Sequence, residues 1–226
     1  MTDKKLLDAV VMESKAAKPE YAIIWMHGLG ADGNDFAPIV PELGIQAPLR
    51  FIFPHAPMMP VTINNGYVMR AWYDIRDADL ANREDVGGLK QSAAQITDWI
   101  DHQVAEGIPP ENIILAGFSQ GGAVALHAGL AYPKPLAGIM ALSTYLMCAE
   151  ELADEAIVRA NQQTSIFMGH GIQDPVVPMT RGQWSCDTLK QHGYSVEWHE
   201  YMMPHAVVPD EIADIAAWLK RQLNLG

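Results

Sequence analysis

Cysteines and long hydrophobic segments are scarce in this sequence. Its 226 residues include only two cysteines, Cys148 and Cys186, and these do not form a CxxC pair. We therefore expect two buried, inert thiols, and neither a disulfide framework nor a zinc site. No apolar run approaches the roughly 18 residues that cross a bilayer, and residues 1–15 lack the apolar core and cleavage site of a signal peptide. The sequence predicts a cytoplasmic protein with no integral membrane association.

Basic residues are also outnumbered. Lys and Arg total 15 against 27 for Asp and Glu, which gives a formal net charge of -12. Such a surface repels phosphate backbones, so we expect no nucleic acid partner. The glycines of HGLGADG, residues 27–33, do not match the dinucleotide-binding pattern, no phosphate-binding Gly-Lys-Ser/Thr follows them, and no helical pair of histidines flanks a glutamate. The sequence therefore predicts no cofactor and no bound metal.

Apolar segments alternate along the chain with segments that we predict to be helical. The apolar segments cover residues 21–26, 49–53, 113–118, 136–142 and 165–168, and residues 195–201 are also strand-like. The predicted helices cover residues 83–106, 120–131, 178–192 and 210–223. Continuous apolar strands separated by helices are typical of a parallel sheet that is buried on both faces. We expect a single α/β domain over residues 1–226, with a mostly parallel central sheet and helices on both faces.

One segment, residues 54–75, interrupts this alternation. It contains three prolines and the turn-forming run Asn64-Asn65-Gly66, so we expect an extended loop with a short hairpin. It is also rich in methionine and aromatic residues, among them Met69, Trp72 and Tyr73. Two interpretations remain open: an irregular segment that packs on the core, and a flap of adaptable apolar side chains beside a binding site.

Ser119 lies between two glycines, Gly117 and Gly121, directly after the apolar residues 113–116. A serine on a sharp strand-to-helix turn has an exposed hydroxyl, and glycines two positions away avoid a collision where the chain folds back. Taken alone, the pattern also fits an ordinary Gly-rich helix start. We take Ser119 as the candidate nucleophile.

A nucleophilic serine needs a histidine base and a carboxylate that orients it. In hydrolases with this turn, the chain order is serine, acid, histidine. Asp174 stands on a turn after an apolar segment, and His205 lies on a loop before the last predicted helix. The alternative residues are less well placed. His170 precedes Asp174 on the same loop, and His199 lies in a predicted strand. Asp187 and Asp210 lie in predicted helices or at their start. The sequence predicts Ser119, Asp174 and His205 as a catalytic triad.

The reaction also needs donors for the oxygen anion that forms during acyl transfer. The backbone amide of Gln120 follows the nucleophile directly. A second donor is expected from HGLGADG, where Gly28 and Gly30 permit a tight bend and leave the amide of Leu29 as the natural candidate.

Six segments, in this order, resemble the phospholipase/carboxylesterase group of α/β-hydrolases, which includes carboxylesterases and acyl-protein thioesterases. They are HGLGADG, PVTINNGYVMRAWYDI, GFSQGGA, LSTYL, HGIQDPVVP and the His-Ala-Val of YMMPHAV. The resemblance spans almost the whole chain. It implies an α/β-hydrolase fold, an acyl-enzyme on Ser119, an acyl groove beside Met69, Trp72 and Tyr73, and a possible homodimer. One departure from the family pattern is Met147-Cys148, where a proline is expected after LSTYL.

These features together predict a serine carboxylesterase that hydrolyses small-molecule esters with short to medium acyl chains. An acyl-protein thioesterase or a lysophospholipase would use the same triad, so both remain alternatives. A non-catalytic ligand-binding protein on the same fold is the third possibility.

Overall fold

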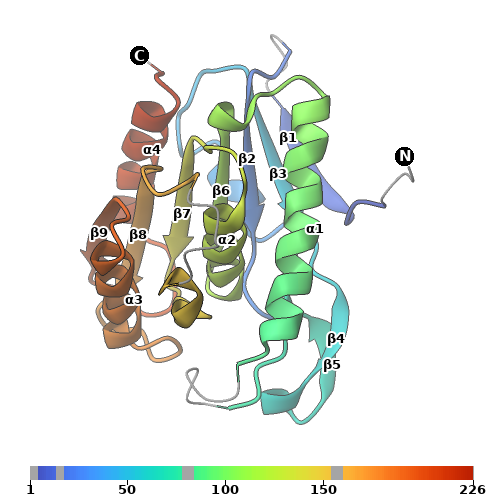
Figure 1. The fold of residues 1–226 in the computed structure, drawn as a ribbon, viewed down its shortest axis with the longest axis vertical. Helices are drawn as coiled ribbons and strands as arrows, with labels where there is room; N and C mark the ends of the chain where they lie inside the picture. The colour runs from blue at the N-terminus through green and yellow to red at the C-terminus, as the bar shows by residue number, and fades with distance from the viewer. Residues whose placement is uncertain (1–4, 14–17, 78–83, 154–159, 226) are drawn as a thin grey trace.

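The described part of the chain forms a central sheet of seven strands in the order β1-β3-β2-β6-β7-β8-β9 (Figure 1). The computed structural model describes residues 5–13, 18–77, 84–153 and 160–225. The strands are β1 (Ala9–Glu13), β2 (Tyr21–Met26), β3 (Leu49–Pro54), β6 (Ile113–Phe118), β7 (Gly138–Leu142), β8 (Ile166–Gly171) and β9 (Val196–Tyr201). Strand β1 pairs antiparallel with β3, and the other neighbours are parallel. The predicted mostly parallel sheet is confirmed.

Helices cover both faces of the sheet. Helices α1 (Val86–Ala105), α2 (Gln120–Ala131) and α3 (Met179–Gln191) pack on one face, and α4 (Pro209–Gln222) packs on the other. Successive strand residues point to opposite faces: Ile23 belongs to the hydrophobic cluster under α4, whereas Ile24 belongs to the cluster under α1 and α2. Because both faces are covered, the central strands are apolar without alternation. The structure confirms an α/β fold with helices on both faces.

The ends of helix α1 follow local sequence signals. The side chain of Asp85 accepts a hydrogen bond from the amide of Gly88, which caps the first turn. Gly107, with a φ of 98°, follows the last turn. The predicted start of this helix at Arg83 lies outside the described residues.

Two strands differ from the expectations. Strand β1 did not stand out in the sequence, because it is a short edge strand whose residues are half-buried or exposed. Strand β8 extends to Gly171 and therefore contains His170, which the sequence placed on the loop of Asp174. The last two residues of β8 pair in parallel with β9, His170 with Glu200 and Gly171 with Tyr201.

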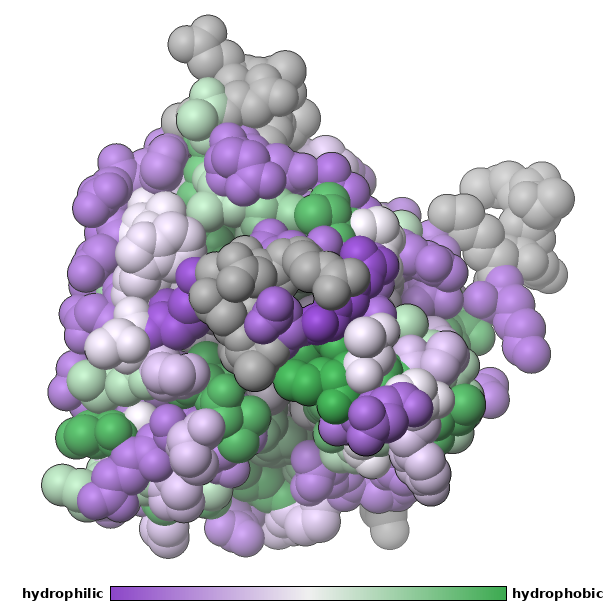
Figure 2. All heavy atoms as spheres, turned by 90° about the horizontal axis from the view of Figure 1, so that it is seen from below, coloured by the Kyte–Doolittle hydropathy of each residue, from purple (hydrophilic) through white to green (hydrophobic). Residues whose placement is uncertain are grey.

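Residues 54–75 contain a two-stranded antiparallel hairpin, β4 (Met58–Val61) with β5 (Tyr67–Arg70). The hairpin lies at the lower end of the molecule in Figure 1. Figure 2 views that end and shows hydrophobic surface interrupted by polar side chains. Met58, Tyr67 and Val68 of the hairpin are 52–70% exposed. Among the described residues, no helix has both the length and the apolar character needed to cross a membrane.

Candidate active site

Ser119 lies on a sharp turn between β6 and α2, in a strained backbone conformation with a φ of 55° and a ψ of -120°. A Cβ atom on Gly117 would lie 2.1 Å from the carbonyl oxygen of Gly121. Two hydrogen bonds hold the serine backbone: its amide donates to the Leu142 carbonyl at 2.9 Å, and the Thr144 hydroxyl donates to its carbonyl at 2.6 Å. The turn therefore needs glycine before the serine, and strand β7 with its following loop fixes the strained residue.

Asp174 and His205 are hydrogen-bonded, with 2.7 Å between Oδ2 of the aspartate and Nδ1 of the histidine. The other oxygen, Oδ1, accepts from the amides of Val176 and Val177 at 2.8 and 2.9 Å. Burial raises the pKa of Asp174, but the hydrogen bonds from His205 and the two amides outweigh it, so the pKa lies below its ordinary value. The ionised carboxylate requires a proton on Nδ1 of His205, which leaves Nε2 unprotonated and able to accept a proton.

The imidazole of His205 lies beside the turn that carries Ser119. Its ring centroid is 4.6 Å from that of Phe118, the residue before the serine. The loop of His205 also packs closely on the end of β8, since a Cβ atom on Gly171 would lie 2.4 Å from the Met203 carbonyl oxygen. The amide of Gln173 donates to that same carbonyl. These contacts bring the three predicted triad residues to one end of the sheet.

The rival histidines have other partners. His170 is fully buried, and its Nε2 contacts the Val177 carbonyl at 2.9 Å and lies 3.6 Å from Oδ2 of Asp174. It therefore packs behind the aspartate. His199 stacks on Phe167 and lies 2.9 Å from Glu197. Both rings therefore contact residues other than Ser119.

His27, which no sequence motif marks as functional, lies at the start of the loop of Leu29 and holds it through two hydrogen bonds. Its Nδ1 donates to the Gly28 carbonyl at 2.7 Å, and its Nε2 accepts from the amide of Ala56 at 3.1 Å. Burial lowers its pKa to about 4, so the ring is neutral at neutral pH and this pair of bonds defines its tautomer. The only sequence signal for this role was a histidine directly after a strand.

The loop of Leu29 packs against the turn that carries Ser119. A Cβ atom on Gly28 would lie 3.4 Å from Cβ of Ser119. Gln120 is the first residue of α2, so its amide has no intrahelical acceptor. The amide of Leu29 makes no hydrogen bond within the described part of the chain. Both amides are therefore available to donate to an oxygen atom held beside Ser119.

The segment after β5 braces the same turn. The amide of Trp72 donates to the Gln120 side chain at 3.0 Å, and that side chain donates to the Tyr73 carbonyl at 2.6 Å. The indole of Trp72 donates to the His27 carbonyl at 2.8 Å. Trp72 and Tyr73 are 2% and 1% exposed, whereas Met69 is partly exposed and lies beside Gly30. A substrate-binding role for Met69, Trp72 and Tyr73 stays a prediction.

Comparison with known proteins shows the family of the chain. The sequence model of the phospholipase/carboxylesterase family matches residues 7–223. The chain belongs to that family. It is 39% identical over 218 residues to an acyl-protein thioesterase 1 of Gibberella zeae, covering 92% of this chain and 93% of that protein. It is 34% identical over 221 residues to a probable carboxylesterase of Oryza sativa, covering 94% and 82%.

Solved structures of the phospholipase/carboxylesterase family and its relatives share the fold. The crystal structure of acyl-protein thioesterase 2 from Zea mays is 28% identical and has a TM-score of 0.85, with 96% of this chain and 99% of that chain covered. The resemblance drawn from the six sequence segments is therefore confirmed. The family is one of hydrolases, and the fold is of the α/β-hydrolase type.

Proposed function

We propose that this protein is a serine hydrolase that cleaves acyl thioesters, with protein cysteines as the acylated group. The reaction class rests on the 2.7 Å hydrogen bond between His205 and Asp174 beside the strained Ser119. The thioester assignment is supported by the relatives named acyl-protein thioesterase 1, the Gibberella zeae protein among them. The thioester assignment replaces the small-ester carboxylesterase, predicted from the sequence, as the leading interpretation.

The proposed reaction proceeds through an acyl-enzyme. The Ser119 hydroxyl attacks the acyl carbonyl carbon while Nε2 of His205 takes its proton. The amides of Leu29 and Gln120 donate to the oxygen anion of the tetrahedral intermediate. The C–S bond then breaks, and His205 returns the proton to the leaving thiolate. Water attacks the acyl-enzyme by the same steps in reverse, which releases a carboxylic acid and restores Ser119.

The surface around the proposed site suits an acyl chain. Met69 lies beside Gly30 on the loop of Leu29, with 3.7 Å between its sulfur and a Cβ atom built on that glycine. Val176, two residues after Asp174, is 57% exposed, and Met202 on the loop of His205 is 74% exposed. An acyl chain that packs on apolar side chains of the loops that carry the proposed triad is removed from water, which is favourable.

A carboxylesterase acting on short to medium oxygen esters is the second candidate, since the Oryza sativa relative is named a probable carboxylesterase. A lysophospholipase would use the same residues. Location in the cytoplasm and formation of a homodimer stay predictions from the sequence.

Matched substrates distinguish these candidates. We would compare oxygen esters, thioesters and lysophospholipids that carry the same acyl chain, in wild type and in Ser119→Ala, and divide each rate by the uncatalysed rate of the same compound. A larger normalised kcat/KM on the thioester supports the proposal, and a larger value on the oxygen ester makes the protein a carboxylesterase. Full turnover in Ser119→Ala would reject the triad, and ligand binding without turnover would revive the binding-protein interpretation.

A further inference from the structure

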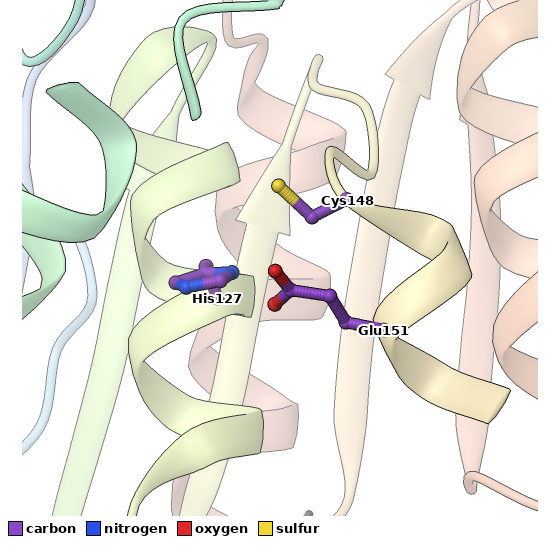
Figure 3. Close-up of side chains that lie close together, drawn as sticks. All are labelled: His127, Cys148 and Glu151. Atoms are coloured by element: carbon purple, nitrogen blue, oxygen red, sulfur yellow. The ribbon is translucent and has the colours of Figure 1, made fainter. Parts of the chain in front are cut away.

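Three potential metal ligands meet outside the proposed triad. His127 lies on α2, Cys148 on the loop after β7, and Glu151 on the short helix η4 (Ala149–Ala153). A ring nitrogen, the Sγ atom and a carboxylate oxygen all lie within 4.8 Å of one another. Figure 3 shows the carboxylate of Glu151 directed toward the His127 ring, with the Cys148 sulfur next to both. Segments that are distant in sequence thus place an imidazole, a thiol and a carboxylate around one space.

The backbone at Cys148 is held in an uncommon conformation that positions its thiol. Its φ is 54°, a left-handed value that costs a non-glycine residue about 1–3 kcal/mol. Its amide donates to Oε2 of Glu84 at 3.1 Å, and its carbonyl accepts from the amide of Glu151 at 3.0 Å. The residue is only 3% exposed. The surrounding structure therefore maintains a strained turn that places the thiol and the carboxylate together.

The three side chains line a small pocket of about 40 Å³. Apolar residues form most of the rest of its lining: Leu130, Ala131, Leu146, Met147 and Leu152. A low-dielectric wall strengthens the attraction between an ion and its ligands. The pocket also has space for a water molecule or small anion as a fourth ligand.

The spacing of the three ligand atoms suits one ion after a small adjustment. Zinc bonds of about 2.0–2.3 Å in tetrahedral geometry place ligand atoms roughly 3.5 Å apart. The ligand atoms of His127, Cys148 and Glu151 lie within 4.8 Å of one another, so side-chain movements of little more than about 1 Å would bring them to this spacing. Oε1 of Glu151 is engaged by Lys90 at 2.6 Å, and the carboxylate has a second oxygen. Since His127 and Glu151 are half-buried, an ion can reach the cluster from solvent.

We propose that His127, Cys148 and Glu151 form a binding site for a thiophilic divalent cation of the Zn²⁺ type. Thiolate and imidazole ligands select zinc-like ions and disfavour Mg²⁺ and Ca²⁺, which prefer oxygen ligands. Binding replaces the thiol proton of Cys148 with a metal–sulfur bond, and one proton is released to solvent. The site is distinct from the proposed triad, because His127 follows Ser119 by eight residues, about 12 Å along α2.

Cobalt provides a direct test that does not depend on catalysis. The full-length protein, freed of metal with a chelator, would be titrated with Co²⁺ and followed by the thiolate-to-cobalt charge-transfer absorption, then by its displacement with Zn²⁺. We expect the band in wild type and in Cys186→Ser, the matched control for the second buried thiol, and its loss in Cys148→Ser. His127→Ala and Glu151→Gln should each weaken binding by at least about tenfold.

Zn²⁺-dependent thermal stabilisation gives a second readout. A ligand that binds only the folded state raises the Tm, so wild type and Cys186→Ser should be stabilised to the same extent and His127→Ala should be stabilised less. A charge-transfer band that persists in Cys148→Ser overturns the proposal. So does the absence of both the band and the Tm increase in folded wild-type protein at millimolar metal.

Discussion

Replacing Gly121 by alanine should damage the candidate site without touching any residue of the proposed triad. Gly121 lies in the first turn of α2, where the helix contacts the end of β2 and the start of the Leu29 loop. A Cβ atom there would lie 2.4 Å from the carbonyl oxygen of Met26 and 2.6 Å from that of His27. Ordinary van der Waals contact begins at 3.4 Å. Since both partners are backbone atoms, helix and loop must separate by about 1 Å.

A displacement of this size should lower both the free energy of unfolding and the catalytic activity. Overpacking of this kind typically lowers the free energy of unfolding by about 1–3 kcal/mol. A misplacement of about 1 Å in a catalytic arrangement reduces activity by about 100-fold, because the amide of Leu29 would move away from the Ser119 hydroxyl. We therefore expect Gly121→Ala to remain folded and to lose about two orders of magnitude in kcat/KM.

Gly87→Ala is the matched control. Gly87 lies in the first turn of α1, where a Cβ atom would be 4.0 Å from its nearest neighbour, Oδ1 of Asp85. Alanine there should stabilise the protein by about 0.5–1 kcal/mol and leave kcat/KM unchanged. Urea denaturation and ester or thioester hydrolysis would be measured for both variants, with the active fraction titrated by a serine-reactive phosphonate. Folded Gly121→Ala with wild-type kcat/KM would refute the reasoning.

Three further predictions concern charge and hydrogen bonding. Asp174→Asn should lower kcat by about 10⁴-fold, because a neutral amide no longer selects the tautomer of His205 with its proton on Nδ1; a kcat close to wild type would contradict the triad. Glu211, fully buried on α4, has a pKa raised to about 8 by burial from an ordinary value of 4.5, so the folded state keeps a proton that the unfolded state loses between those values. Wild type should therefore lose roughly 4 kcal/mol of stability relative to Glu211→Gln as the pH rises from 4.5 to 8, as measured by urea denaturation at several pH values, and parallel pH profiles would disprove this. Trp72→Phe should cost about 1–3 kcal/mol, because it leaves the buried His27 carbonyl without the indole donor; unchanged stability in thermal unfolding would show that this bond is dispensable.

Local patterns in the sequence were sufficient to predict much of the architecture. Strand β6 and helix α2 have the predicted bounds, because a continuous apolar segment followed by a Gly-rich helix start admits few alternative structures. The end of α1 before Gly107 follows from a local signal in the same way. By contrast, β1 is an edge strand with exposed residues, so its hydrophobic pattern was too weak to detect.

The candidate site likewise has features that the sequence predicts and a distance that only folding decides. The glycines around Ser119 and the order of serine, acid and histidine are properties of the sequence alone, and they were enough to nominate Ser119, Asp174 and His205. The 2.7 Å bond between Asp174 and His205 joins positions 31 residues apart. Only the packing of the His205 loop on the end of β8 decides that distance.

Tertiary structure alone decided the remaining arrangements. One of the two hydrogen bonds of the His27 ring comes from the amide of Ala56, 29 residues away. His127, Cys148 and Glu151 share no metal-binding spacing, and they meet only because α2 packs beside the loop after β7. Sequence spacing determines which residues share one strand or helix, whereas contacts between separate elements depend on how their apolar faces pack together. The sequence by itself determined the parallel strands, the helices and the candidate nucleophile, and the folded chain decided which distant side chains lie within bonding distance.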